Sequence, residues 1–297
     1  MFMNDFKTLA RAAEAEMRGV FAETPLQKNA HLSAIYDADI WLKREDLSPV
    51  RSYKLRGAFN AMRKLTDQKH FVCASAGNHA QGFAVSCSTL GYKGKVFMPT
   101  TTPNQKIEQV KKFGKTNVEV VLYGENFTQA YEKALQECDK YDKTFIHPFD
   151  DKKVIAGQAT LFLEIINQFK DHLDYLFIPI GGGGLISGAI NVFKQLSPET
   201  KIIGIEPKGA PSMSQSINKN KLITLNRIDG FVDGVAVKGF EEVAVGFASI
   251  IMSTHRQWVV PEVTGRGIVR GRKIIIGRRG IITIDGPDSS YWLVGNI

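Results

Sequence analysis

The alternation of strand-like and helix-like segments in this sequence predicts an α/β fold of two lobes, with parallel or mixed sheets flanked by helices. From about residue 70, short apolar runs rich in Val, Ile and Phe are each followed by an amphipathic segment of helical length. The chain of 297 residues is long enough for two lobes or one large domain. Its 43% of hydrophobic and 23% of charged residues are typical of a globular protein.

The expected elements follow one another in regular order. A strand, a helix and a second strand at this spacing form a crossover unit, so we expect parallel strands with helices on both faces. Function in such folds gathers at the carboxyl ends of the strands. The expected strands are residues 70–74, 95–99, 118–123, 144–148, 175–180 and 201–206, and the expected helices are residues 78–91, 103–114, 126–141, 154–169 and 185–196.

Residues that commonly begin or end helices mark several of these boundaries. Pro103 and Asn126 stand where helices would begin, and Gly91 and Gly114 stand where helices would end. They support the segmentation that the apolar pattern predicts.

The net charge of +8 does not by itself indicate a nucleic-acid-binding protein. Residues 263–297 carry six Lys or Arg against two Asp, so half of the excess lies in this short segment. The rest of the chain is mildly basic, which is as consistent with small anionic ligands as with a polyanion. The sequence has no zinc-finger spacing, no aromatic RNA-binding motif and no heptads. We therefore expect no nucleic-acid partner.

The sequence also predicts a cytoplasmic protein with no membrane partner. No apolar run approaches the length of a membrane span. The N-terminal segment MFMNDFKTLARAAEAEM carries acids and has no long apolar stretch, unlike a secretory signal. Cys73, Cys87 and Cys138 are odd in number and follow no metal-ligand spacing, which suits a reducing compartment.

Four consecutive glycines form the strongest local signal. They follow the expected strand 175–180 and open the expected helix 185–196. Without side chains, successive backbone N–H groups can converge on an anion, and the helix N-terminus adds partial positive charge. The run is neither a Walker A loop nor a GxGxxG motif. It predicts a phosphate site, the alternative being a flexible loop or close packing of strand and helix. The residues concerned are Gly181, Gly182, Gly183, Gly184 and Leu185.

A second turn between strand and helix contains Ser75, Ala76, Gly77, Asn78 and His79. Ser75 and Asn78 offer side-chain oxygens beside backbone N–H groups, which suits a substrate carboxylate. Helix capping is the alternative, and a single His at a helix start is more often structural. No second metal ligand stands nearby at helical spacing, so we expect no metal.

Lys54 is the candidate for covalent chemistry. A lysine amine forms a Schiff base with a carbonyl compound, and pyridoxal phosphate is the common carbonyl cofactor. Arg51 and Arg56 could help to keep the amine neutral if they face it. Because most lysines are surface residues, the spacing alone leaves the role of Lys54 open.

Taken together, the motifs resemble the serine/threonine dehydratases, which are pyridoxal-phosphate enzymes with the tryptophan-synthase-β fold (fold type II). The order and spacing fit from residue 24 to about residue 238, and the surroundings of Lys54 look most like the biosynthetic threonine dehydratases. The matching motifs are Thr24-Pro25-Leu26, Lys43-Arg44-Glu45-Asp46, Ser52-Tyr53-Lys54-Leu55-Arg56-Gly57-Ala58, Ser75-Ala76-Gly77-Asn78-His79-Ala80-Gln81-Gly82, His147-Pro148-Phe149-Asp150, Gly181-Gly182-Gly183-Gly184-Leu185-Ile186-Ser187-Gly188 and Asp229-Gly230-Phe231-Val232-Asp233-Gly234-Val235-Ala236-Val237.

The resemblance implies a role for each group of matched residues. Lys54 would bind pyridoxal 5'-phosphate covalently and remove the α-proton of the substrate, and Asn78 would hydrogen-bond the ring oxygen of the cofactor. Residues 181–185 would hold the phosphate, and residues 75–79 would bind the substrate carboxylate. Threonine, and to a lesser extent serine, would lose water and ammonia. The product from threonine would be 2-oxobutanoate, the entry to isoleucine synthesis.

The resemblance also implies an organisation. Residues 1–70 and 149–238 would form a discontinuous cofactor-binding lobe, residues 71–148 a small lobe, and the protein would be a homo-oligomer. Glu206 and Ala210 resemble a cation site of some relatives, but Ser212 replaces the expected acid, so no metal is expected there.

The family pattern stops near Lys238. Residues 239–297 are rich in Gly and Arg and lack two expected features, a Glu-Pro-Ala-Gly stretch and a later Ser or Cys turn against the pyridine nitrogen. We interpret the break as an incomplete C-terminal part of the catalytic domain, arising from a frame change or a truncated reading frame. The segment 263–297 could be a strand-rich addition, a disordered extension or foreign sequence.

Four alternatives to a threonine ammonia-lyase stay open at this point. The chain could be an inactive remnant of such an enzyme, a serine racemase-like enzyme, a β-replacement synthase or a basic binding module. The residues around Lys54 argue against a synthase, whereas the motifs of racemases and dehydratases overlap.

Overall fold

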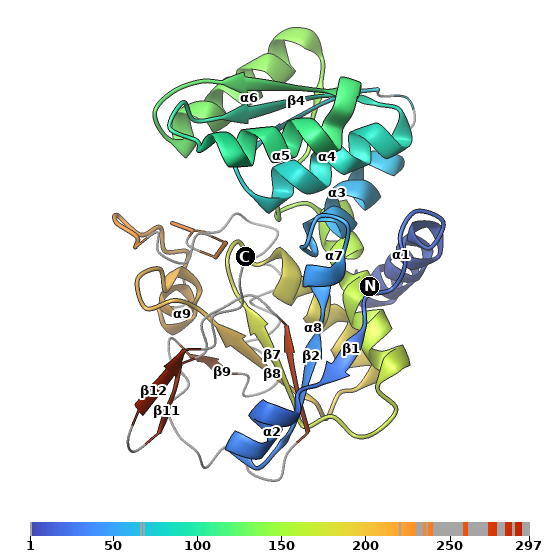
Figure 1. Ribbon diagram of the computed structural model, residues 1–297, viewed down its shortest axis with the longest axis vertical. Coiled ribbons are helices and arrows are strands. Elements are labelled where there is room, and N and C mark those ends of the chain that lie inside the picture. The colour runs from blue at the N-terminus through green and yellow to red at the C-terminus, as the bar shows by residue number, and fades with distance from the viewer. Residues whose placement is uncertain are drawn as a thin grey trace.

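The computed structural model describes residues 2–65, 67, 69–219, 221–229, 234–235, 237–239, 258–260, 273–277, 283–286 and 289–292. Two larger sheets, each flanked by helices, dominate this part of the chain (Figure 1). One sheet is parallel and the other is mixed, so the predicted α/β class is confirmed.

The four-stranded sheet comes from the middle of the chain and lies at the top of Figure 1. Its strand order is β5-β4-β3-β6, and each described pairing is parallel. Its strands are β3 (His70–Ala74), β4 (Lys93–Met98), β5 (Val118–Leu122) and β6 (Thr144–Phe145), and the helices between them are α4 (Asn78–Leu90), α5 (Asn104–Gly114) and α6 (Phe127–Tyr141).

Both faces of this sheet are covered because successive strand residues point to opposite sides. Phe71 and Cys73 of β3 pack with α4 and α5 on one face. Val72 and Ala74 pack with α6 on the other face. The nearly continuous apolar runs of the sequence are therefore buried on both sides, as expected of parallel strands.

The six-stranded sheet has the order β1-β2-β10-β7-β8-β9. Of its pairings, β1 with β2 is antiparallel and the others are parallel. Its strands are β1 (Leu26–Lys28), β2 (Asp39–Lys43), β10 (Lys273–Gly277), β7 (Tyr175–Pro179), β8 (Lys201–Ile205) and β9 (Trp258–Val260).

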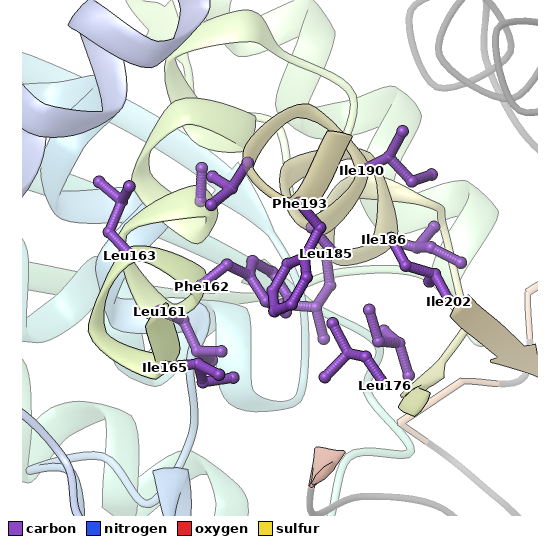
Figure 2. Packing of buried hydrophobic residues seen from close by; sticks show 14 of the residues in the cluster. Leu161, Phe162, Leu163, Ile165, Leu176, Leu185, Ile186, Ile190, Phe193 and Ile202 are labelled. Carbon is purple, nitrogen blue, oxygen red and sulfur yellow. The ribbon is translucent and has the colours of Figure 1, made fainter. Parts of the chain in front are cut away.

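The largest hydrophobic cluster lies against one face of this sheet. Helices α1 (Phe2–Met17), α7 (Lys152–Gln168) and α8 (Gly184–Leu196) contribute to it. Figure 2 shows Phe162 of α7 and Phe193 of α8 at its centre, and their ring centroids are 6.3 Å apart in an edge-to-face arrangement. Helix α2 (Ala30–Tyr36) covers the opposite face.

The remaining described elements are short or connect the two sheets. Helix α3 (Lys54–Arg63) lies between the two parts of the molecule, next to α7 (Figure 1). The others are the 3-10 helices η1 (Glu45–Leu47) and η2 (Lys115–Asn117), helix α9 (Ser212–Asn218), and the antiparallel pair β11 (Thr283–Gly286) and β12 (Ser289–Trp292). None of the described helices has the length and apolar character needed to cross a membrane.

The predicted helix boundaries agree with the structure to within two residues. Asn126 caps α6, since its Oδ1 accepts the N–H of Gln129 at 3.1 Å. Pro103 directly precedes α5, and Gly91 ends α4 with a φ of 70° in the left-handed region that favours glycine.

One predicted strand is shorter than expected. Residues 144–148 were expected to be extended in the sheet, but β6 ends at Phe145. The N–H of Ile146 still donates to the carbonyl of Val72 at 2.8 Å. Pro148 has no N–H to continue a ladder, so the chain leaves the sheet there and turns toward Lys54.

Part of the C-terminal segment lies at the centre of the larger sheet. Strand β10 pairs with β2 on one side and with β7 on the other. Ile274 and Ile275 are only 1% and 0% exposed. The segment 263–297 was expected to be a strand-rich addition, a disordered extension or foreign sequence. Residues 273–277 form a strand, which agrees with the first of these alternatives. The prediction that residues 239–297 lack the turn against the pyridine nitrogen falls mostly outside the described residues.

Candidate active site

Lys54 is the first residue of α3 and follows a turn held by two serines. The N–H of Ser52 donates to Oγ of Ser48 at 2.8 Å, and the N–H of Lys54 donates to Oγ of Ser52 at 3.1 Å. Arg51 in this turn has a φ of 56°, in the left-handed region that is uncommon for residues other than glycine. The turn therefore fixes the start of the helix that carries the candidate lysine.

Two glycines let neighbouring helices approach the backbone of α3. A Cβ on Gly82 of α4 would lie 2.8 Å from the backbone nitrogen of Leu55. A Cβ on Gly157 of α7 would overlap the carbonyl oxygen of Arg56. Since neither position has room for a methyl group, α3 is held between α4 and α7 at its first turn.

The amine of Lys54 points to the turn that follows β6. Its Nζ donates a hydrogen bond to the carbonyl oxygen of Pro148 at 2.7 Å. The ring centroids of Tyr53 and Phe149 lie 5.5 and 5.8 Å from Nζ, within range of a cation–π attraction. The amine is therefore enclosed by two aromatic rings and one carbonyl group.

Phe149 connects Lys54 to the glycine loop. A Cβ on Gly182 would overlap the ring of Phe149, and a Cβ on Gly184 would lie 2.6 Å from its carbonyl oxygen. The absence of side chains in the loop thus permits this contact. Lys54 and the predicted phosphate loop, which are more than a hundred residues apart in sequence, meet at this aromatic residue.

The glycine loop ends in the N-terminus of α8. Gly183 has a φ of 83°, and no side chain caps the helix. The first N–H groups of a helix have no intrahelical acceptor, so they can bind an anion at this end. Leu185 is 8% exposed and belongs to the core below the loop. This geometry fits a phosphate group.

The turn of residues 75–79 leads into α4, but some of its expected donors are occupied. The N–H of Ser75 donates to the carbonyl of Phe97 at 3.1 Å. The N–H of Gly77 donates to Oγ of Ser75 at 3.1 Å, and Gly77 is the N-cap of α4 without a side-chain cap. The N–H groups of Asn78 and His79, in the first helical turn, remain the better candidates to bind a carboxylate.

The side chain of His79 is directed into the protein. It is 3% exposed, and its Nε2 is 2.9 Å from the carbonyl oxygen of Ile146, to which it donates. Nδ1 has no hydrogen-bond partner among the described residues. Burial and the charge of Lys54 lower the pKa of His79 to about 3. The imidazole is therefore neutral near pH 7, and its structural role agrees with the more common function of a histidine at a helix start.

His147 is a second neutral imidazole beside Lys54. Its Nδ1 accepts the N–H of Phe149 at 3.3 Å and that of Asp150 at 2.7 Å. Burial lowers the pKa of His147 to about 4, with the charge of Lys54 adding to the effect and that of Asp150 opposing it.

The suggestion that Arg56 faces the amine of Lys54 is wrong. Arg56 is 1% exposed and binds two carboxylates away from that amine. Its Nη2 lies 2.8 Å from Oε1 of Glu45, and its Nη1 lies 2.6 Å from Oε1 of Glu164. The guanidinium of Arg56 is attracted by the two buried carboxylates, whereas the charged amine of Lys54 would repel it.

Lys43 completes this buried cluster of charges. Its Nζ donates to Oε2 of Glu164 and to the carbonyl of Thr24, both at 2.6 Å. Burial alone would raise the pKa of Glu164, but the charges and hydrogen bonds of Arg56 and Lys43 lower it to about 2. The motifs around Thr24, Lys43 and Arg56 thus meet beneath the first turn of α3.

The residues near the suggested cation site have a different arrangement. The carboxylate of Glu206 accepts the N–H groups of Met213 at 2.7 Å and Ser214 at 2.8 Å, which caps α9. Burial raises the pKa of Glu206 although these hydrogen bonds oppose the shift. Within the described ranges, no three His, Cys, Asp or Glu residues are grouped to hold a metal ion.

A family model described as "Pyridoxal-phosphate dependent enzyme" matches residues 17–283, and the chain belongs to this family. The match extends beyond residue 238, where the motif resemblance ends. Nζ of Lys54 is an amine that could react with the aldehyde of such a cofactor, and the N–H groups at the start of α8 have no side-chain cap that would compete with its phosphate. The residues present therefore fit pyridoxal phosphate.

Within this family, the chain is similar to proteins that are named threonine dehydratases. The "L-threonine dehydratase biosynthetic IlvA" of Halalkalibacterium halodurans is 52% identical over 234 residues, 78% of this chain and 56% of that protein. The protein of the same name from Bacillus subtilis is 49% identical over 233 residues, 77% and 55% of the two chains. The chain thus spans little more than half the length of these curated relatives.

The fold is also similar to the solved structures of a threonine deaminase and a serine racemase. The processed form of threonine deaminase isoform 2 from Solanum lycopersicum superposes with a TM-score of 0.83 at 35% identity, over 94% of this chain and 89% of that one. Maize serine racemase superposes with a TM-score of 0.78 at 27% identity, over 85% and 76%.

Sequence reasoning did not assign roles to two features of the site. Pro148 and Phe149 were matched only as part of a family motif, and nothing in their spacing relates them to Lys54. Glu164 was not singled out, although an acid within the apolar stretch LFLEII of α7 is a recognisable signal of a buried ion pair.

Proposed function

We propose that this chain is a pyridoxal-phosphate-dependent ammonia-lyase that converts L-threonine, and L-serine to a lesser extent, into a 2-oxo acid and ammonia. The convergence of the Lys54 amine and the glycine loop on Phe149 is the observation that carries the proposal. Relatives about half identical in sequence and named threonine dehydratase support the substrate. The product from threonine would be 2-oxobutanoate, for use in isoleucine biosynthesis.

In this proposal each part of the site has a separate task. When bound, the cofactor supplies an aldehyde and an electron-withdrawing ring. Nζ of Lys54 would hold the cofactor, would be released from it when the amino group of the substrate takes its place, and would then accept the α-proton of the amino acid. The N–H groups of residues 181–185 hold the phosphate. The side chain of Asn78 would orient the ring, and the turn of residues 75–79 would bind the substrate carboxylate through the N–H groups of Asn78 and His79. The β-hydroxyl leaves as water, and hydrolysis releases ammonia.

The amine of Lys54 provides the direct test. Purified chain incubated with pyridoxal phosphate should develop an absorbance band near the visible edge that borohydride abolishes, with the cofactor then attached to Lys54. Lys54→Ala should show no such band, because the variant lacks the nucleophilic amine. A wild-type chain without the band would contradict the proposal.

The products separate this function from the alternatives. Threonine should yield 2-oxobutanoate, measured as its hydrazone. A band with neither a 2-oxo acid nor a D-amino acid as product would identify an inactive remnant. The superposition with a serine racemase makes racemisation the second candidate, and chiral chromatography after incubation with L-serine would detect D-serine.

Location and assembly belong to the same proposal. Cys73, Cys87 and Cys138 are free and buried, which supports a cytoplasmic location. We also propose a homo-oligomer, and light scattering coupled to size exclusion should give a mass above that of one chain. A monomeric mass would contradict this part of the proposal.

A further inference from the structure

The turn of residues 147–150 is held together by a side chain within it. Nδ1 of His147 accepts the N–H of Phe149 at 3.3 Å and that of Asp150 at 2.7 Å. The rings of His147 and Phe149 also meet edge to face, with centroids 4.7 Å apart and an interplanar angle of 88°. One imidazole therefore fixes both the backbone and the aromatic residue of this turn.

The same turn contacts both halves of the candidate site. Its Pro148 carbonyl accepts the hydrogen bond from Nζ of Lys54 at 2.7 Å. Its Phe149 fills the space beside Gly182 and Gly184. If this turn shifted, the Pro148 carbonyl that accepts from Lys54 and the Phe149 ring that packs on the glycine loop would both move.

We propose that His147 is a positioning residue, whose Nδ1 holds the turn so that Pro148 and Phe149 keep the Lys54 amine directed at the glycine loop. This inference rests on the proposed function, because it assigns His147 a task in cofactor attachment. The task needs a lone pair on Nδ1, and therefore a neutral imidazole with its proton on Nε2. The burial of His147 next to Lys54 favours that form.

Three variants separate this role from simple packing. In His147→Asn, Oδ1 occupies the place of Nδ1, since both atoms are bonded to Cγ, and it can accept the same two N–H groups. In His147→Gln the acceptor lies one bond farther out. His147→Ala has no acceptor. His172→Ala is the control, because the side chain of His172 is 64% exposed and lies far along the chain from the turn.

The experiment measures two properties of Lys54 in each folded variant. The first is the rate at which pyridoxal phosphate becomes fixed to Lys54 by borohydride, followed by peptide mass spectrometry. The second is the rate at which acetic anhydride labels the Lys54 amine without any cofactor. Urea unfolding of each variant reports whether the fold is kept.

The Asn variant and the control should match the wild type within about threefold. The Gln and Ala variants should attach the cofactor about tenfold more slowly and be acetylated faster, since the Nζ–Pro148 hydrogen bond no longer holds the amine. Wild-type rates in the Gln variant, or slow attachment in a folded Asn variant, would overturn the inference. If His147→Ala does not fold, the comparison of Asn with Gln decides.

The two proposals fail in different ways. If the wild-type chain does not bind pyridoxal phosphate at Lys54, the proposed function fails. The acetylation rates still test the positioning, because they need no cofactor, and equal rates in the Asn and Gln variants would refute it.

Discussion

The absence of a side chain at Gly182 allows Phe149 to pack against the glycine loop and leaves the backbone of the loop open to a ligand. The ring of Phe149 occupies the space that a Cβ would fill. Nearby, Gly183 needs its positive φ of 83° for the chain to enter α8. The sequence predicted the importance of these glycines and gave phosphate binding or close packing of strand and helix as the reason. It did not show that Phe149 packs on them, because this residue comes from a distant turn.

We expect Gly182→Ala to lower the free energy of unfolding by about 1–3 kcal/mol, because the new methyl group must displace the ring of Phe149. Gly19→Ala is a matched control, since its Cβ would meet only the carbonyl oxygen of Glu16, at an ordinary contact distance of 3.7 Å. The control should stay within about 0.5 kcal/mol of wild type. Urea unfolding measures both, and equal stability of the two variants would contradict the packing of Phe149.

Among the elements, α3 depends on the helices and strands around it. Arg56 in its first turn binds Glu45 of η1 and Glu164 of α7, and Lys43 of β2 binds Glu164 as well. These charged side chains are almost fully buried, so each is stable only while an oppositely charged partner compensates for the loss of hydration. The cluster thus ties the helix that begins with Lys54 to both the larger sheet and α7.

The low pKa of Glu164 predicts an acid-dependent loss of stability. Its folded-state pKa of about 2 lies below the ordinary value of 4.5, so its contribution is fully present above pH 4.5 and is lost as the pH falls toward 2. The contribution is on the order of 3 kcal/mol. Urea unfolding between pH 7 and pH 3 should show the larger part of this decrease in the wild type.

Glu164→Gln should remove this dependence and lower stability at pH 7 by about 3–5 kcal/mol, since Lys43 and Arg56 lose a buried counter-charge. Glu108→Gln is the control, because Glu108 is 68% exposed and pairs only with Lys111 among the described ion pairs. It should change stability by less than about 0.5 kcal/mol. A Glu164→Gln variant that kept the wild-type acid response would show that another group is responsible.

At the scale of the whole molecule, the larger sheet is closed by a strand from the other end of the chain. Strand β10 places Ile275 between Trp41 of β2 and Leu176 of β7. Without it, the inner edges of two strands would lie open. The sheet that carries the glycine loop therefore depends on residues far beyond the last recognised motif.

Ile275→Ala should cost about 2–5 kcal/mol of unfolding free energy, because it leaves a cavity at a side chain with 0% exposure. Lys273→Ala in the same strand should cost less than about 0.5 kcal/mol, since its side chain is 37% exposed and pairs with the exposed Asp171. Thermal unfolding of both variants checks the difference. An Ile275 variant as stable as the Lys273 variant would contradict the central position of β10.

The sequence by itself determined the class of the fold, the strands and helices from residue 70 to residue 205, and the glycine loop at the end of a strand. These features depend on local periodicity and on residues with special backbone preferences, which a short window contains. Only the tertiary structure decided that Arg56 binds Glu45 and Glu164, that Pro148 and Phe149 join Lys54 to the loop, and that β10 completes the sheet. Such contacts join residues from about ten to more than two hundred positions apart, and no local pattern specifies which distant partner a buried charge, a carbonyl group or a strand edge will meet.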